Sequence, residues 1–199
     1  MAGRTRVLRT NFRNTLQIHA VAERYRAATG GADPETMPEA YRDGPEPELF
    51  EGADEQELLD LLARSVGIFV DRLGYAPEDL CVLAPRESHL RVVGARLSRE
   101  GRTSADIRDR DFDFGRAGSV RLSTMHSVKG LDFPVVLLYV PEFHPGHGAL
   151  HVGTEDRMAR NLVYTAVSRA MDCLAVFVPA GELHPTIGDL AACMTPGET

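Results

Sequence analysis

The sequence is almost without lysine, because 22 residues are Lys or Arg and only Lys129 is a lysine. A phosphate-binding P-loop needs a glycine-rich turn that ends in Lys followed by Ser or Thr. The ammonium group reaches the β- and γ-phosphates, and the hydroxyl group holds magnesium. Lys129 is instead followed by Gly130. The scarcity of lysine therefore excludes a P-loop from these 199 residues.

Positive charge is also scarce. The chain carries 29 acidic residues against 22 basic ones, and its formal net charge is -7 at pH 7. A domain that attracts nucleic acid through its overall field is usually basic, so a general attraction of this kind is excluded. Any contact with nucleic acid must therefore be local.

Long apolar runs and metal-ligand cysteine patterns are missing as well. The longest apolar stretch is the short run VVLLYV at 135–140, and the N-terminal residues are polar with scattered arginines. Neither has the length of a membrane span or of a signal-peptide core. The three cysteines, Cys81, Cys173 and Cys193, are odd in number. We therefore expect a cytoplasmic protein with reduced, buried thiols and no membrane contact.

The spacing of apolar residues predicts helices that alternate with strands. Recurrence at helical spacing predicts helices, and short continuous apolar runs predict buried strands. The expected helices cover 16–29, 54–73, 88–98 and 155–170; the expected strands cover 80–84, 120–124, 134–140 and 173–178, after a β-prone segment at Val7–Leu8. This alternation indicates one α/β domain over 1–199 with a mostly parallel sheet flanked by helices.

Three segments are expected to be loops. Residues 30–53 are rich in Gly, Pro and acids, which is typical of an irregular surface crossing, and residues 101–119 are charged and form a short connection. The third loop follows residue 140 and contains three histidines without an accompanying Cys or carboxylate cluster, so we expect no metal site there. Its histidines are His144, His147 and His151.

Two segments resemble motifs of a known family. STMHSVKGLDFPVV at 123–136 and RNLVYTAVSRAMDCLAVF at 160–177 look like motifs V and VI of UvrD/Rep-type superfamily-1 DNA helicases, in that order. NFRNT at 11–15 resembles the family's Asn-Tyr-Arg-Ser segment, and EDLCVLAPRESHLRVVGARLSREG at 78–101 resembles the strand-helix unit that follows it. The resemblance covers almost the whole chain and implies the second, C-terminal RecA-like domain of such a helicase, which lacks its own P-loop.

The resemblance implies that ATP and Mg2+ are held mainly by an N-terminal P-loop helicase domain of the same protein. Arg13 and Arg169 match the family's two arginines that reach the γ-phosphate. A guanidinium group can stabilise the charge on that phosphate, which is the role of an arginine finger. Arg169 is expected near the end of the helix at 155–170, on the edge of the domain. The alternative is an ordinary cation at a helix terminus.

Three further residues match positions that lie near the nucleotide in the family. Phe12 stands where a tyrosine stacks on adenine, and phenylalanine keeps the π-face of that ring. Asp132 stands where a longer glutamate lies close to the ribose, and Gly130 allows a close approach of the backbone. The alternatives are core packing for Phe12 and a helix cap or a solvated side chain for Asp132.

Motif V also carries the positions nearest to single-stranded DNA. Thr124, His126 and Lys129 match them, and they supply the hydroxyl, imidazole and ammonium groups that phosphate oxygens require. The alternative for His126 is a buried histidine with satisfied hydrogen bonds.

The expected function is the C-terminal half of an ATP-dependent DNA helicase or translocase, for which the resemblance implies 3′→5′ movement. By itself the chain should hydrolyse no ATP. UvrD and Rep carry a large helical insertion before motif V, where this chain has only the short connection at 101–119. The alternative is a catalytically silent RecA-like interaction or regulatory module.

Overall fold

The computed structural model describes residues 10–28, 39–144 and 154–194. The helices are α1 Leu16–Ala28, α2 Glu55–Gly67, α3 Glu87–Arg99, α4 Thr154–Val167 and α5 Pro185–Met194, with a π-helical turn at Ile68–Arg72 and a 3-10 turn at Pro77–Asp79. The strands are β1 Thr10–Thr15, β2 Glu39–Arg42, β3 Glu48–Gly52, β4 Leu80–Ala84, β5 Ser104–Asp106, β6 Val120–Thr124, β7 Phe133–Tyr139 and β8 Ala170–Pro179.

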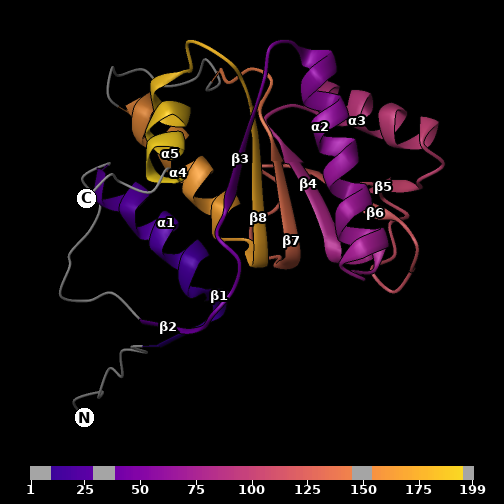
Figure 1. The fold of residues 1–199 in the computed structure, drawn as a ribbon, viewed down its shortest axis with the longest axis horizontal. Helices are drawn as coiled ribbons and strands as arrows, with labels where there is room; N and C mark the ends of the chain where they lie inside the picture. The colour runs from indigo at the N-terminus through magenta and orange to yellow at the C-terminus, as the bar shows by residue number, and fades with distance from the viewer. Residues whose placement is uncertain (1–9, 29–38, 145–153, 195–199) are drawn as a thin grey trace.

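A six-stranded sheet forms the centre of the molecule, in the order β3-β8-β7-β4-β6-β5. The strands of this sheet pair in parallel with their neighbours. Helices α2 and α3 cover one face, and α1, α4 and α5 cover the other (Figure 1). Because both faces are covered, central strands such as β4 are apolar and buried along their whole length. The expected α/β RecA-like arrangement is confirmed.

Helix α2 begins with a reciprocal cap. The Asp54 carboxylate accepts a hydrogen bond from the backbone N–H of Glu57 at 2.8 Å, and the Glu57 carboxylate accepts one from the N–H of Ala53 at 2.8 Å. Leu58 and Leu62 then lie fully inside the core. The predicted helix at 54–73 is therefore present, but its last turn, Ile68–Arg72, is π-helical.

The prediction of an irregular crossing at 30–53 was wrong for part of that segment. Strand β2 pairs with β1 in a separate two-stranded sheet, and β3 pairs with β8 at the edge of the main sheet. The ring of Phe50 stacks on Phe177 of β8 with centroids 5.0 Å apart, while Glu48 and Glu51 are exposed. Leu49 and Phe50 are adjacent and pack against the two different core clusters, so the strand is half-buried in a segment that looks polar overall.

Other differences are smaller. The connection at 101–119 contains β5, which pairs with β6, and α5 was not predicted. The helix predicted at 155–170 ends at Val167, so Ser168 and Arg169 lie in the turn before β8. Residues Val7–Leu8 lie outside the described residues.

The cysteines are free thiols: Cys81 and Cys173 are buried, and Cys193 is partly buried. Across the ranges that the structure describes, no helix combines the length and the apolar character that a membrane crossing requires.

Candidate functional site

The amino ends of β7 and β8 place two predicted site residues side by side. Asp132 directly precedes β7, and Arg169 directly precedes β8. The two strands start in register, with Phe133 opposite Ala170, and the Phe133 N–H donates to the Arg169 carbonyl at 3.0 Å. The parallel register therefore brings the ends of motif V and motif VI together.

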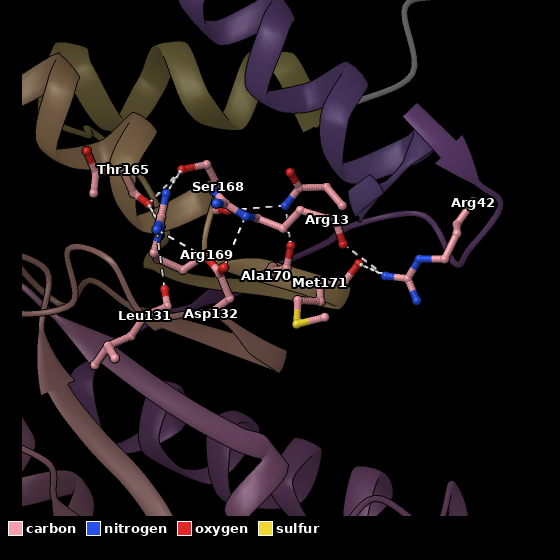
Figure 2. Close-up of polar contacts among 10 residues, drawn as sticks. Arg13, Arg42, Leu131, Asp132, Thr165, Ser168, Arg169, Ala170 and Met171 are labelled. Atoms are coloured by element: carbon pink, nitrogen blue, oxygen red, sulfur yellow. Dashed lines mark hydrogen bonds and ion pairs between the residues drawn. The ribbon is translucent and has the colours of Figure 1, made fainter. Parts of the chain in front are cut away.

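Arg13 completes a cluster of three charged side chains. Its Nε atom lies 3.0 Å from Oδ2 of Asp132, and Nη1 of Arg169 lies 3.2 Å from Oδ1 of the same carboxylate. Figure 2 shows both guanidinium groups beside this carboxylate. The structure thus joins three of the residues that the sequence assigned to the nucleotide, Arg13, Asp132 and Arg169.

Arg169 is held by several acceptors besides Asp132. Its Nε donates to the Thr165 carbonyl at 3.1 Å, Nη1 donates to the Leu131 carbonyl at 3.4 Å, and Nη2 donates to Oγ of Ser168 at 3.1 Å. Only 12% of the side chain is exposed. We expected an arginine near a helix end on the domain edge, and it is instead largely buried in the turn after the helix.

Burial sets the electrostatics of Arg169. Desolvation lowers the pKa of its guanidinium group, the Asp132 carboxylate opposes this shift, and the nearby Arg13 cation adds to it. Arginine nevertheless stays charged in proteins. The Asp132 carboxylate therefore compensates two cations, one largely buried and one half exposed.

Two side chains that sequence reasoning missed tie the backbones of these segments together. The Asn14 amide donates to the carbonyls of Ser168, at 3.2 Å, and Ala170, which flank Arg169. Nη2 of Arg42 donates to the carbonyls of Arg13 and Met171, at 3.0 and 3.1 Å (Figure 2). Asn14 lies inside the motif-like segment NFRNT and could have been considered, whereas Arg42 lies in a segment taken for a loop.

Thr124 lies at the opposite, carboxyl end of the sheet. It is opposite Ala84, the last residue of β4, and its Oγ1 donates to Oγ of Ser127 at 3.0 Å. The next residues form a series of turns in which Met125 and Val128 are buried, and His126 and Lys129 are exposed. The alternative of a buried His126 is therefore wrong, and both His126 and Lys129 are open to solvent.

Residues 125–132 run from one end of the sheet to the other. The register against β4 places Thr124 level with Ala84 and Val135 level with Leu80. At about 3.3 Å per residue, Thr124 and Asp132 are roughly 20 Å apart along the strands. Gly130, in this connection, has φ +87 with open space around its missing Cβ, so its backbone conformation requires glycine. Thr124 and Asp132 thus lie at different ends of the sheet, whereas Lys129 and Gly130 are neighbours in the connection between them.

Some predicted features lie outside the described residues. The backbone of Phe12 belongs to β1, but its side chain is not among those described, and His147 and His151 lie in the undescribed segment 145–153. Among the residues that are described, no group of three or more His, Cys, Asp or Glu could hold a metal ion.

Comparison with known proteins identifies a similar fold. No family model matches the chain, and no curated protein sequence matches it. Among solved structures, the C-terminal domain of a possible DNA helicase from Lactobacillus plantarum WCFS1 is similar with a TM-score of 0.64. The match covers 91% of this chain and 94% of that chain at 18% sequence identity. At this identity the likeness shows a shared fold.

Proposed function

We propose that this chain is the C-terminal, second RecA-like half of an ATP-dependent DNA helicase or translocase. The observation that carries the proposal is the convergence of Arg13 and Arg169 on one carboxylate at the amino ends of β7 and β8. The solved domain with a similar fold comes from a possible DNA helicase, which agrees with this function. The resemblance of the two motifs to UvrD/Rep helicases supports the finer assignment and the 3′→5′ direction.

The donor set at this cluster fits an anion. Two guanidinium groups already surround a carboxylate, and a guanidinium binds carboxylate and phosphate oxygens with the same planar geometry. In the proposed enzyme, ATP and Mg2+ are held by an N-terminal P-loop domain of the same protein, and Arg13 and Arg169 face the γ-phosphate across the domain interface. Their part in hydrolysis is to neutralise charge that develops on this phosphate. Phe12, Gly130 and Asp132 contact the nucleoside in this proposal.

The series of turns that follows β6 is the proposed contact for single-stranded DNA. Thr124 ends β6, and the exposed His126 and Lys129 follow it. The exposed imidazole and ammonium groups can bind phosphate oxygens locally, which suits a chain whose overall charge is negative, whereas Thr124 is buried and its hydroxyl donates to Ser127. Residues 125–132 connect the end of β6 with the arginine cluster, so the two sites can respond to each other through one short segment.

The nucleotide half is tested with the ATPase assembled from this chain and its P-loop domain. We expect Arg169→Ala to lower kcat by roughly 10³–10⁵ while ATP still binds, because an arginine finger acts mainly in the transition state. Arg169→Lys should rescue little, since one ammonium group does not reproduce the guanidinium fork. The loss of the hydrogen bonds of Arg169 should cost the fold about 1–2 kcal/mol, which a thermal melt monitors.

The control variant is Arg160→Ala, which removes a surface arginine of α4 that pairs with Asp189 at 3.2 Å. It should leave turnover unchanged. Near-normal turnover in Arg169→Ala would reject the finger assignment. An assembly that binds its partner domain but never hydrolyses ATP would favour the silent interaction module.

The DNA half is tested by Lys129→Ala with single-stranded DNA in the same assembly. We expect weaker binding, weaker stimulation of the ATPase by DNA, and a salt dependence of log K that is shallower by roughly 0.7. Arg99→Ala, which removes an exposed cation at the end of α3, is the matched control. Unchanged binding and stimulation in Lys129→Ala would reject motif V as the DNA contact.

A further inference from the structure

Arg42 binds the backbone of both segments that carry the clustered arginines. Its Nη2 atom donates to the carbonyl of Arg13 at 3.0 Å and to the carbonyl of Met171 at 3.1 Å. Met171 lies two residues after Arg169, on the first part of β8. One guanidinium group therefore joins β1, which carries Arg13, to β8, which follows Arg169 (Figure 2).

A carboxylate fixes the direction of this guanidinium group. Nη1 of Arg42 lies 2.8 Å from Oδ1 of Asp172, the next residue along β8. The attraction between Nη1 and this carboxylate favours the orientation in which Nη2 donates to the two carbonyl groups. Asp172 thereby orients the group that links the two backbones, and both terminal nitrogens of Arg42 are occupied by the protein.

The backbone contacts of Arg42 can hold Arg13 and Arg169 in place when their side chains do not share a carboxylate. Asp132 joins the side chains of Arg13 and Arg169, and the Arg13 side chain is 47% exposed. When a phosphate displaces that carboxylate, the relative position of the two arginines depends on their backbones. The bonds from Arg42, together with those from Asn14 to the carbonyls of Ser168 and Ala170, hold these backbones together.

We propose that Arg42 is a positioning residue, which keeps Arg13 and Arg169 at the spacing that one phosphate requires, with Asp172 as the residue that orients it. This inference rests on the proposed ATPase function. It assigns a role to β2, which neither the motifs nor the resemblance includes. Because Arg42 binds two carbonyl groups and a carboxylate, its role requires a cation with several donors and not the shape of a core side chain.

The first experiment measures steady-state ATPase in the assembly with the P-loop domain. We expect Arg42→Ala to lower kcat about 10- to 100-fold with little change in KM for ATP, the scale of a misplaced catalytic group. Arg42→Lys should recover part of this loss, because an ammonium group still donates to both carbonyls. Asp172→Asn should give a smaller loss of the same kind. Arg96→Ala, which breaks ion pairs of α3 with Asp60 and Glu100, is the control and should not change kcat.

The second experiment combines the change with the loss of the finger. If Arg42 acts through Arg13 and Arg169, then Arg42→Ala should reduce kcat far less in an Arg169→Ala background than in the wild type. An undiminished additional loss would overturn the inference, as would wild-type kcat in Arg42→Ala. Activity that survives Arg169→Ala would instead overturn the proposed function, so the two failures are distinguishable.

A third measurement needs no nucleotide. In ¹⁵N NMR spectra of this chain, the Nε–H resonance of Arg169 should shift in Arg42→Ala and return toward its original position in Arg42→Lys. Arg96→Ala should leave it in place. A resonance that does not move in Arg42→Ala would also overturn the inference, because the arginine would then be held without Arg42.

Discussion

The Asp132 carboxylate pairs with both proposed finger residues, Arg13 and Arg169. One carboxylate therefore balances the charge of both arginines when no nucleotide is bound. Two guanidinium groups that approach each other without an anion between them repel, and Asp132 removes that repulsion inside the domain. The same carboxylate then competes with any phosphate that enters. Preorganisation of the arginines and weak binding of anions are therefore two results of one contact.

This competition predicts the effect of Asp132→Asn. The variant keeps the shape of the side chain and removes its charge, so an anion without a ribose should bind more tightly. We expect inorganic triphosphate to bind this chain about fivefold more tightly, or about 1 kcal/mol, the scale of a partly exposed ion pair. Calorimetry at low salt measures the change, which should shrink as salt is added.

Asp60→Asn provides the comparison, because Asp60 of α2 pairs with Arg96 at 3.1 Å on another part of the surface. It should bind triphosphate as the wild type does. Equal triphosphate affinity in Asp132→Asn and wild type would contradict the idea that the carboxylate occupies the place of a phosphate.

At the scale of elements, strands that are apolar throughout were predictable, and a short strand with apolar residues at only two adjacent positions was not. Every residue of β4 is buried, and β7 is almost as apolar, so continuous runs indicated both strands. Strand β3 is short and stands among acids and prolines, and the stacking of Phe50 on Phe177 joins distant parts of the chain. Helix α5 shows helical spacing at Ile187, Leu190 and Met194, so it was visible but not recognised.

The site divides in the same way. Motif resemblance indicated Arg13, Asp132 and Arg169 one by one, but their convergence depends on the parallel register of β7 and β8. The burial of Arg169 could not be predicted either, because it follows from where α4 ends. Nothing in the local sequence indicated Arg42, since its contact needs β2 to lie beside β1.

The close packing of β3 against α2 predicts that Gly52→Ala lowers the free energy of unfolding. A Cβ atom at Gly52 would lie 2.8 Å from Cγ of Leu58 and 3.0 Å from its backbone nitrogen. The first turn of α2 must then move away from β3, and we expect a loss of about 1–3 kcal/mol of unfolding free energy. Urea denaturation of the variant measures this loss.

Gly188→Ala is the matched substitution within α5, where a Cβ atom would meet nothing within 4 Å. It should be neutral or stabilise the protein by up to about 1 kcal/mol, because alanine favours a helix. If both variants have the same unfolding free energy, β3 and α2 do not pack as described.

At the scale of the whole molecule, buried thiols make the fold sensitive to alkali. Burial raises the pKa of the thiols of Cys81 and Cys173 in the folded protein. In the unfolded chain a thiol has its ordinary pKa of about 8.5. Above about pH 8.5 the unfolded chain loses thiol protons that the folded protein keeps. The contribution of the buried thiols to the free energy of unfolding is therefore fully present below about pH 8.5 and is lost as the pH rises.

We therefore expect the free energy of unfolding to decrease between pH 8.5 and 10, with each buried thiol contributing up to about 1.4 kcal/mol per pH unit. Urea denaturation under reducing conditions at several pH values measures the slope. Cys81→Ala should reduce the slope by the share of one thiol, even though the smaller side chain also lowers stability at pH 7. A flat profile from pH 7.5 to pH 10 would contradict this expectation.

The exposed turn that carries Lys129 also makes the protein selectively reactive. Lys129 is the only lysine of the chain and is exposed, so an amine-selective acylating reagent can modify no other side chain amine. Mass spectrometry of the acylated chain should find one modified side chain, besides any modified α-amino group. If the proposed function holds, single-stranded DNA should slow modification at Lys129 in the assembly with the P-loop domain and leave the α-amino group as an internal reference. Equal labelling with and without bound DNA would place the strand elsewhere. A fluorophore attached at this position would report the arrival of the strand in real time, without any engineered attachment site.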